Sequence, residues 1–345
     1  MQKKTYDLRY SYIRIIACLA VVVLHTVFVA FTIHQNEISA PAYRTTQCLV
    51  HNMMWAVPCF VMVSGALLLD PAREVGFRKL FTVYIRRVLT ALCISCVAFR
   101  LFDMVMNHEA FSAKIIGEGL LNIVTGKTWG QMWYLYLLIG LYLLLPFYKK
   151  VSANSSRKEI LYLLAVYFVF ESLFLLLGLT KISTAFYIHV SSIYPFYLFA
   201  GYYLRHHGNP GKAVWAPVFI VATVLLIVLT ARRISGGNES LEILFGYSSP
   251  LIAVQSMAFY GFMLGTGRVK SSRLAAFIRD LDAASFGIYL IHLAFIRLFI
   301  RYMKVDPYTN GYWFVLVVII SFFGSYIIVT LYKHGIKALR GKRSC

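Results

Sequence analysis

Two ionisable side chains lie inside the first hydrophobic segment of the chain and could perform chemistry there. Arg14 is near the start of the run at residues 13–31, and His25 follows eleven residues later. At ~3.6 residues per turn this spacing is about three turns, so both side chains share one helix face, roughly 16 Å apart. An imidazole can take a proton from a hydroxyl, and a guanidinium can bind phosphate bidentately. The pair predicts acid–base chemistry near an anion-binding group.

The same two residues also have a structural interpretation. A charged side chain in a spanning helix is costly, so it usually faces the bundle interior and marks a functional site. Arg14 could instead extend to the headgroups at one membrane surface, and His25 could be a hydrogen-bonded packing residue. Both interpretations require that the run crosses a membrane, which the rest of the sequence has to support.

The composition is typical of a polytopic membrane protein. Of 345 residues, 59% are hydrophobic and 14% are charged, against about 45–50% and about 25% in soluble domains. The net charge of +20 is ordinary for basic loops between apolar segments, and no basic, aromatic-rich soluble domain is present to bind nucleic acid. The six cysteines lack partners at metal-ligand spacing, so we expect no metal, no disulfide framework and no tightly bound cofactor.

Ten apolar segments predict an all-α bundle of about ten transmembrane helices. We expect one domain over residues 1–345, with a membrane core at 10–333 and a basic cytoplasmic tail at 334–345. Of the 34 Lys and Arg residues, 23 fall on one predicted side and ten on the other, with Arg14 left uncounted because it lies within a helix; this distribution predicts cytoplasmic termini. The expected segments are 10–33, 48–70, 80–103, 131–148, 159–179, 185–204, 212–231, 247–266, 283–303 and 311–333.

Two longer connections on the predicted outer side could border an acceptor site. Residues 114–124 form an amphipathic pattern, which predicts a helix that lies along the interface or between other helices. Residues 232–246 contain Gly-Gly-Asn, which is typical of a turn. An ordinary solvated connector is an equal alternative for the second.

Five motifs follow one another along nearly the whole chain. In order they are the Arg-x10-His run, FVMVSGALLL at 60–69, Arg86-Arg87, MWYLYLLIGLYLLLP at 132–146 and SFGIYLIH at 285–292. Together they resemble the acyltransferase-3 family of bacterial integral-membrane acyltransferases, of the surface polysaccharide O-acetyltransferase type. One position departs from the family pattern, which often reads Arg-x-x-Arg where this chain has Tyr84 three residues before Arg87.

The resemblance implies a multi-pass enzyme of the bacterial cytoplasmic (inner) membrane. It implies transfer of an acyl group, commonly acetyl from cytoplasmic acetyl-CoA, to a hydroxyl of a surface glycan or lipid-linked sugar. It makes His25 the catalytic residue, as general base or acyl carrier, with Arg14 as its companion. Arg14, Arg86 and Arg87 would then bind the phosphates of the acyl-CoA. The expected partners are acyl-CoA, the glycan acceptor and membrane lipids.

Three residues of the middle motifs could support such a site. Ser64, beside Gly65, could allow close approach of the donor, although small pairs in spanning helices mostly serve packing. Trp133 and Tyr134 could line the path of the acceptor by stacking on sugar rings, or belong to an interfacial aromatic belt.

Three later residues are also candidates. Glu171 lies near the middle of its segment, where a carboxylate must be neutral or paired; it could orient His25 or pair elsewhere. His292, with Tyr289 one turn earlier, could join the site or be a hydrogen-bonded packing residue.

Two other classes of function remain as alternatives. A transporter or flippase for a sugar or lipid-linked intermediate predicts internal repeats or helices broken by Gly and Pro, and the sequence shows neither pattern clearly. A non-catalytic membrane sensor could use the same fold to recognise a ligand.

Overall fold

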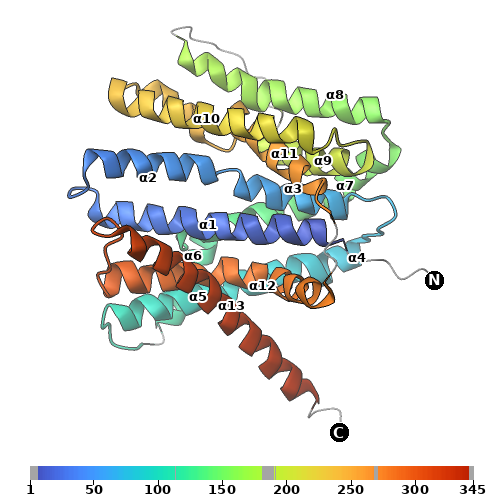
Figure 1. Ribbon diagram of the computed structural model, residues 1–345. Helices are drawn as coiled ribbons and strands as arrows, with labels where there is room; N and C mark the ends of the chain where they lie inside the picture. Colours follow the sequence, from blue (N-terminus) through green and yellow to red (C-terminus); the bar gives the residue numbers. More distant parts are fainter. Residues whose placement is uncertain (1–6, 113, 181–189, 191, 268–270, 342–345) are drawn as a thin grey trace.

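The computed structural model describes residues 7–112, 114–180, 190, 192–267 and 271–341. These residues form helices, and no strand occurs among them, as the all-α prediction requires. Figure 1 shows α1 (Leu8–His34) in the middle of the bundle. On one side of α1 lie α2 (Ala40–Met53) and α3 (Ala56–Leu68), and on the other lie α12 (Ser272–Arg297) and α13 (Gly311–Gly341).

Eight helical segments within the described ranges are long and apolar enough to cross a membrane. The other two predicted spans contain shorter helices, α9 (Ile193–His206) and α11 (Pro250–Leu264), of 14 and 15 residues. At ~1.5 Å per residue these cover only about 21–23 Å of a core that is about 30 Å thick. Part of the span expected at 185–204 lies outside the described residues. Most of α9 is buried by neighbouring helices.

The remaining elements follow the predicted segments with shifted ends. The amphipathic stretch at 114–124 forms α6, which packs against α5, and α13 continues to Gly341, so the expected tail begins as helix. The other elements are α4 (Phe77–Lys79), η1 (Leu80–Ile85), α5 (Arg86–Met106), α6 (Lys114–Thr125), η2 (Gly130–Met132), α7 (Trp133–Asn154), α8 (Arg157–Phe168), η3 (Val169–Leu173), η4 (Phe174–Leu179), α10 (Lys212–Gly236), η5 (Glu239–Phe245) and η6 (Leu298–Tyr302).

Local sequence explains several of these boundaries. Pro58 has no N–H to donate to the preceding turn, and the helix is interrupted just before it, between α2 and α3. The capping box of Ser156 and Glu159 starts α8. Gly237, with a φ of 59°, ends α10 in the left-handed conformation that glycine adopts without strain.

Two glycines bring α3 and α9 into direct backbone contact. A Cβ atom on Gly65 would lie 1.8 Å from the carbonyl oxygen of Leu198, and one on Gly201 would lie 1.9 Å from that of Met62. No side chain larger than hydrogen fits at either position. The packing interpretation of the Ser64-Gly65 pair is therefore confirmed for Gly65.

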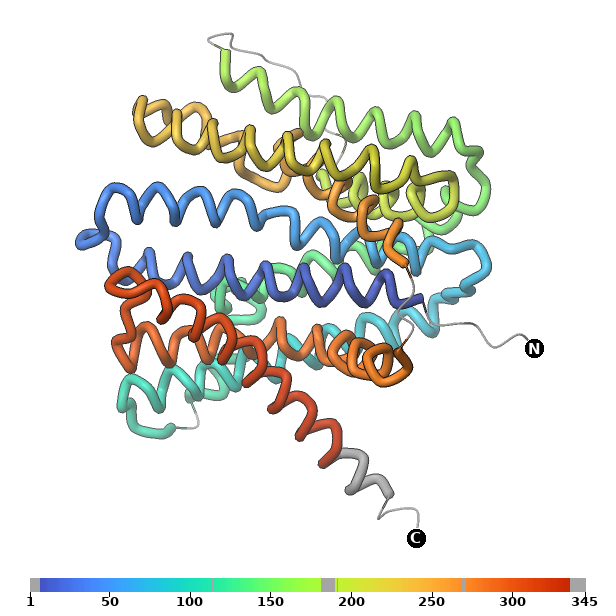
Figure 2. The backbone as a smooth tube through the Cα atoms, in the orientation of Figure 1, coloured from blue at the N-terminus to red at the C-terminus, as the bar shows by residue number. Residues whose placement is uncertain are grey.

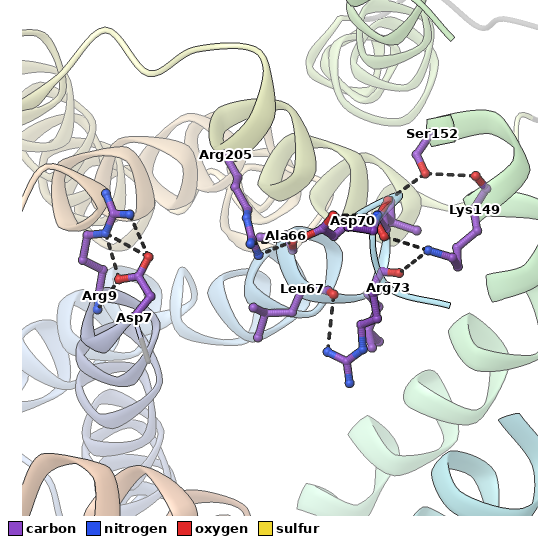
Figure 3. A network of polar contacts seen from close by, with 12 residues as sticks. Asp7, Arg9, Ala66, Leu67, Asp70, Arg73, Lys149, Ser152 and Arg205 are labelled. Atoms are coloured by element: carbon purple, nitrogen blue, oxygen red, sulfur yellow. Dashed lines mark hydrogen bonds and ion pairs between the residues drawn. The ribbon is translucent and has the colours of Figure 1, made fainter. Parts of the chain in front are cut away.

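Basic side chains cap the carboxyl-terminal end of α3, where the last backbone carbonyls have no partner within the helix (Figure 3). Arg205 donates to the carbonyl of Ala66, Arg73 to that of Leu67, and Lys149 to those of Leu68 and Asp70. The Asp70 carboxylate also pairs with Arg205 at 3.2 Å. These cations therefore stabilise a helix terminus as well as biasing the charge of this end of the bundle.

The first helix begins and the last helix ends on the same side of the molecule. In Figure 2, α1 begins and α13 ends towards the right-hand side of the bundle. This arrangement agrees with an even number of crossings. The assignment of that side to the cytoplasm stays a prediction from the basic residues.

Candidate active site

The candidate site lies between α1 and α12, which run parallel and are joined at three levels. Arg14 contacts Asp282 at the first level, and the Cys18 thiol donates to the Ser285 carbonyl oxygen at the second, with an Sγ–O distance of 3.6 Å. The third level joins His25 to His292. Arg14 and His25, eleven positions apart on α1, therefore face Asp282 and His292, which are ten positions apart on α12.

At the first level, the Asp282 carboxylate binds both Arg14 and Ser11. Nε and Nη2 of Arg14 donate to the two carboxylate oxygens, each at 2.6 Å, and the Ser11 hydroxyl donates to Oδ2 at 2.8 Å. The Asp282 side chain is 2% exposed and that of Arg14 is 28% exposed. A bidentate pair of this kind neutralises the guanidinium and fixes its plane.

At the third level, the two imidazoles form a hydrogen-bonded relay. Nδ1 of His25 lies 2.7 Å from Nε2 of His292, and Nδ1 of His292 lies 3.1 Å from the carbonyl oxygen of Ile288. A carbonyl can only accept, so in the neutral relay Nδ1 of His292 carries its proton and Nε2 accepts from His25. Nε2 of His25 is then the nitrogen with a lone pair, able to accept a proton or attack a carbonyl.

A cavity of about 390 Å³ lies on the side of these histidines towards the start of α1. Arg14 and Asp282 line it, together with Arg73 and Arg87. Three cations therefore face one carboxylate, which makes the cavity attractive to an anion. The cavity reaches Tyr289, one helical turn before His292.

Its basic wall is built from the loop between α3 and α4, which contributes Arg73, and from α5, which contributes Arg87. Nη2 of Arg73 donates to the Tyr84 hydroxyl at 2.7 Å, so the tyrosine that departs from the Arg-x-x-Arg pattern contacts another arginine. The Arg87 guanidinium carbon lies 5.4 Å from the centroid of the Phe286 ring, a distance typical of a cation–π contact.

Some of the other predicted site residues line this cavity, and others lie elsewhere. Ser64, Tyr134 and Tyr289 line the cavity. The rings of Tyr134 and Tyr289 lie 5.4 Å apart at their centroids, and the Tyr289 hydroxyl donates to the Gln131 carbonyl. Ser64 also donates to the Phe60 carbonyl of its own helix.

Three predicted site residues lie away from this cavity. Arg86 is exposed at the start of α5, next to Arg87 but not part of the cavity lining. Trp133 packs against Tyr194 and Tyr247 and lines a separate cavity of about 200 Å³. Glu171 is half-buried in η3, which packs against α8, η4 and α11, so it is not brought to His25.

Sequence reasoning missed Asp282, Arg73 and Gln131. The segment containing Asp282 was expected to begin at 283, because nearby charges lower the local hydropathy, whereas α12 begins at Ser272 behind the Ser271 cap. The signal in the sequence that could have identified Asp282 was its position, as a carboxylate ten residues before His292. Gln131 is fully buried and its side-chain amide has no hydrogen-bond partner, which in native proteins often indicates a group that meets a ligand or water.

The comparison with known families gives the class of the protein. The family model of the acyltransferase domain that defines the acyltransferase-3 family matches residues 7–330. The chain belongs to the acyltransferase-3 family. It is therefore a membrane acyltransferase, and the family match includes every residue of the relay, the ion pair and the cavity. No match was found among curated proteins or among solved structures.

The donor set of this acyltransferase does not suggest a metal. Within the described ranges, no three His, Cys, Asp or Glu side chains lie together in a way that could hold a metal ion. The polar side chains that line the neighbouring cavity are instead hydroxyls, guanidinium groups and one carboxylate. Such groups can bind an anion and move a proton.

Proposed function

We propose that this acyltransferase moves an acetyl group from cytoplasmic acetyl-CoA to a hydroxyl of a cell-surface glycan or related envelope acceptor in the bacterial inner membrane. The observation that carries the proposal is the His25–His292 relay, positioned just beyond a cationic cavity that Arg14 of α1 and Asp282 of α12 both line. The cavity would admit the donor from the predicted cytoplasmic side. The relay would present Nε2 of His25 to the thioester or to the acceptor hydroxyl.

The phosphates of the donor are assigned to Arg87 and Arg73. Both guanidinium groups line the cavity, whereas the exposed Arg86 stands beside it. Arg14 acts mainly as a positioning residue, because two of its donors are engaged by Asp282. This division revises the sequence-based expectation that Arg14 and Arg86 bind the phosphates directly.

Two chemical routes use the same nitrogen. In the direct route, Nε2 of His25 takes the proton of the acceptor hydroxyl while its oxygen attacks the acyl carbon; the C–S bond breaks, a C–O bond forms and the thiolate of CoA receives the proton. In the covalent route, Nε2 first attacks the acyl carbon and the C–S bond breaks, which releases the CoA thiolate. The acceptor oxygen then attacks the acyl carbon, the N–C bond to the imidazole breaks, and the proton of the hydroxyl passes by way of the freed Nε2 to the thiolate. The unpartnered amide of Gln131 supports a polar acceptor near Tyr289.

The test uses purified protein in nanodiscs with acetyl-CoA labelled in the acetyl group. Wild type should bind acetyl-CoA and release CoA, by transfer to a supplied glycan or by slow hydrolysis. His25→Ala should bind acetyl-CoA normally and lose at least about 100-fold in rate. His206→Ala is the matched control, since His206 is an exposed histidine at the end of α9.

Two results would contradict the proposal. A wild-type protein that neither binds acetyl-CoA nor releases CoA would exclude this donor. Full activity in His25→Ala would exclude the assigned residue but would leave the class of the enzyme intact.

A further inference from the structure

A second and larger cavity, of about 680 Å³, lies among α8, α9, α10 and α11, away from the α1–α12 pair. Leu164, Phe168 and Phe196 line its apolar part, and Arg157 and His207 line the end where α8 begins and α9 ends, which we call its mouth. This end lies on the same side as the start of α1 (Figure 2). It is therefore at the predicted cytoplasmic end of the bundle.

Three neighbouring side chains, Arg157, Tyr203 and His207, form the mouth. Nε of Arg157 donates to the Tyr203 hydroxyl at 3.1 Å, and its guanidinium carbon lies 5.9 Å from the centroid of that ring. The Tyr203 and His207 rings lie 5.6 Å apart at their centroids. Tyr203 therefore places a permanent cation and an imidazole on the same rim of the cavity.

His207 has an unmet hydrogen-bonding need at this rim. Its Nε2 is buried and has no hydrogen-bond partner. Burial lowers the pKa of His207, and the positive charge of Arg157 lowers it further, so the ring is neutral near pH 7. A buried polar atom without a partner costs free energy, which an oxygen acceptor at the mouth would offset.

The lining as a whole is positive at the mouth and apolar within. Among the described residues that line it, Arg157 is the charged one and no carboxylate occurs. The cavity also opens between helices whose outer faces carry exposed apolar side chains, such as Leu161 on α8 and Val221 on α10. A molecule with an anionic head and a hydrocarbon tail complements both parts.

We propose that this cavity binds one anionic phospholipid, with its phosphate between Arg157 and His207 and an acyl chain along Leu164, Phe168 and Phe196. Anionic lipids are concentrated in the leaflet that faces the cytoplasm, and basic pockets between spanning helices on that side are suited to their headgroups. The lipid would stabilise the packing of α8, which contacts mainly α9. This site is independent of the acyl-transfer chemistry.

The experiment compares two lipids of identical acyl chains, phosphatidylglycerol and phosphatidylcholine, added to delipidated protein in detergent. Native mass spectrometry should detect one retained phosphatidylglycerol on wild type, and the thermal midpoint should rise with that lipid more than with phosphatidylcholine. The double variant Arg157→Gln with His207→Leu should bind phosphatidylglycerol at least about fivefold more weakly, and its midpoint should barely respond.

Two further variants separate lipid binding from general effects. Lys158→Gln removes the neighbouring exposed cation, which does not line the cavity, and should behave as wild type. Ala165→Trp keeps both polar groups and fills the apolar part of the cavity beside Leu164 and Phe168, which Ala165 also lines, so it should also lose the response. Each variant is first compared without added lipid, so that a folding defect is recognised.

The proposal is overturned if phosphatidylcholine and phosphatidylglycerol act equally, or if the double variant and Lys158→Gln respond alike. It is also overturned if inorganic phosphate reproduces the full shift, because the cavity would then bind a free anion. Retention of the lipid by Ala165→Trp would place it on another surface.

Discussion

The carboxylate of Asp282 accepts three hydrogen bonds in a buried position, and these bonds decide what Arg14 can do. Two come from the guanidinium of Arg14 and one from the hydroxyl of Ser11. A guanidinium held in this way contributes little free charge to the cavity. Its main effect is to set the height and rotation of α1 against α12, and therefore the position of His25 three turns away.

Removal of one partner of this pair should destabilise the protein more than removal of both. Asp282→Asn leaves the Arg14 charge uncompensated and should cost about 3 kcal/mol, at the low end for a buried pair because Arg14 is 28% exposed. The double variant Arg14→Met with Asp282→Leu should recover much of that loss. Thermal midpoints in detergent measure both effects; a double variant less stable than Asp282→Asn would contradict the pairing.

The relay predicts that replacing His292 by glutamine and replacing it by asparagine have different effects on the acyl-transfer rate. Gln can place its amide oxygen near the position of Nε2 and so accept from His25, whereas the shorter Asn reaches only the position of Nδ1. We expect His292→Gln to keep a measurable acyl-transfer rate and His292→Asn to lose about 100-fold or more. Acyl-transfer rates with labelled acetyl-CoA are compared between variants that have equal thermal midpoints. Equal loss in both variants would indicate that His292 only fills space.

At the scale of the elements, α1 and α3 position the two walls of the cavity, and each is held by a different kind of contact. Polar contacts of Arg14, Cys18 and His25 hold α1 against α12. The close approach of Gly65 and Gly201 holds α3 against α9. Since Ser64 lines the cavity next to Gly65, the position of this wall depends on the α3–α9 contact.

Alanine at these glycines should therefore destabilise the bundle. The added methyl group of Gly65→Ala would meet rigid backbone, so we expect a cost of at least about 3 kcal/mol. Gly140→Ala on α7 is the matched control, because nothing lies within 4 Å of its added Cβ, and it should be neutral or stabilising through helix propensity. Thermal midpoints of the two variants are compared; a midpoint for Gly65→Ala equal to that of wild type would contradict the close contact.

At the scale of the whole molecule, the two cavities and the capped end of α3 all lie towards the end where α1 begins. Arg73 and Arg87 line the first cavity, which we propose to admit the donor and call the donor cavity, and the second cavity has Arg157 at its mouth. Basic residues that bias membrane topology therefore also line cavities and cap a helix at the same end.

The predicted orientation can be measured directly. Alkaline phosphatase is active only outside the cytoplasm, so a fusion after Arg44 should be active and one after Lys158 should be silent. Fusion levels are normalised by immunoblot. The reverse pattern would place the donor cavity on the outer side and would contradict a cytoplasmic acyl-CoA.

The class of the protein and the approximate limits of most helices could be predicted from the sequence. Long apolar runs and the alternation of basic loops are local properties, so α1 and α13 were expected within a few residues of their observed starts. The start of α12 was placed about ten residues late, because the charges near Asp282 hide the first turns of the helix from a hydropathy argument. The short helices α9 and α11 were also expected to be longer.

By itself, the sequence determined that Arg14 and His25 share one face of a spanning helix, since helical periodicity is a local property of the backbone. Only the tertiary structure decided which residues they meet. Asp282 and His292 lie 268 and 267 positions further along the chain, and no local pattern encodes a contact at that separation. The packing of α1 on α12 therefore places Arg14 in an ion pair with Asp282, and it leaves the lone pair of His25 on Nε2 in the neutral relay.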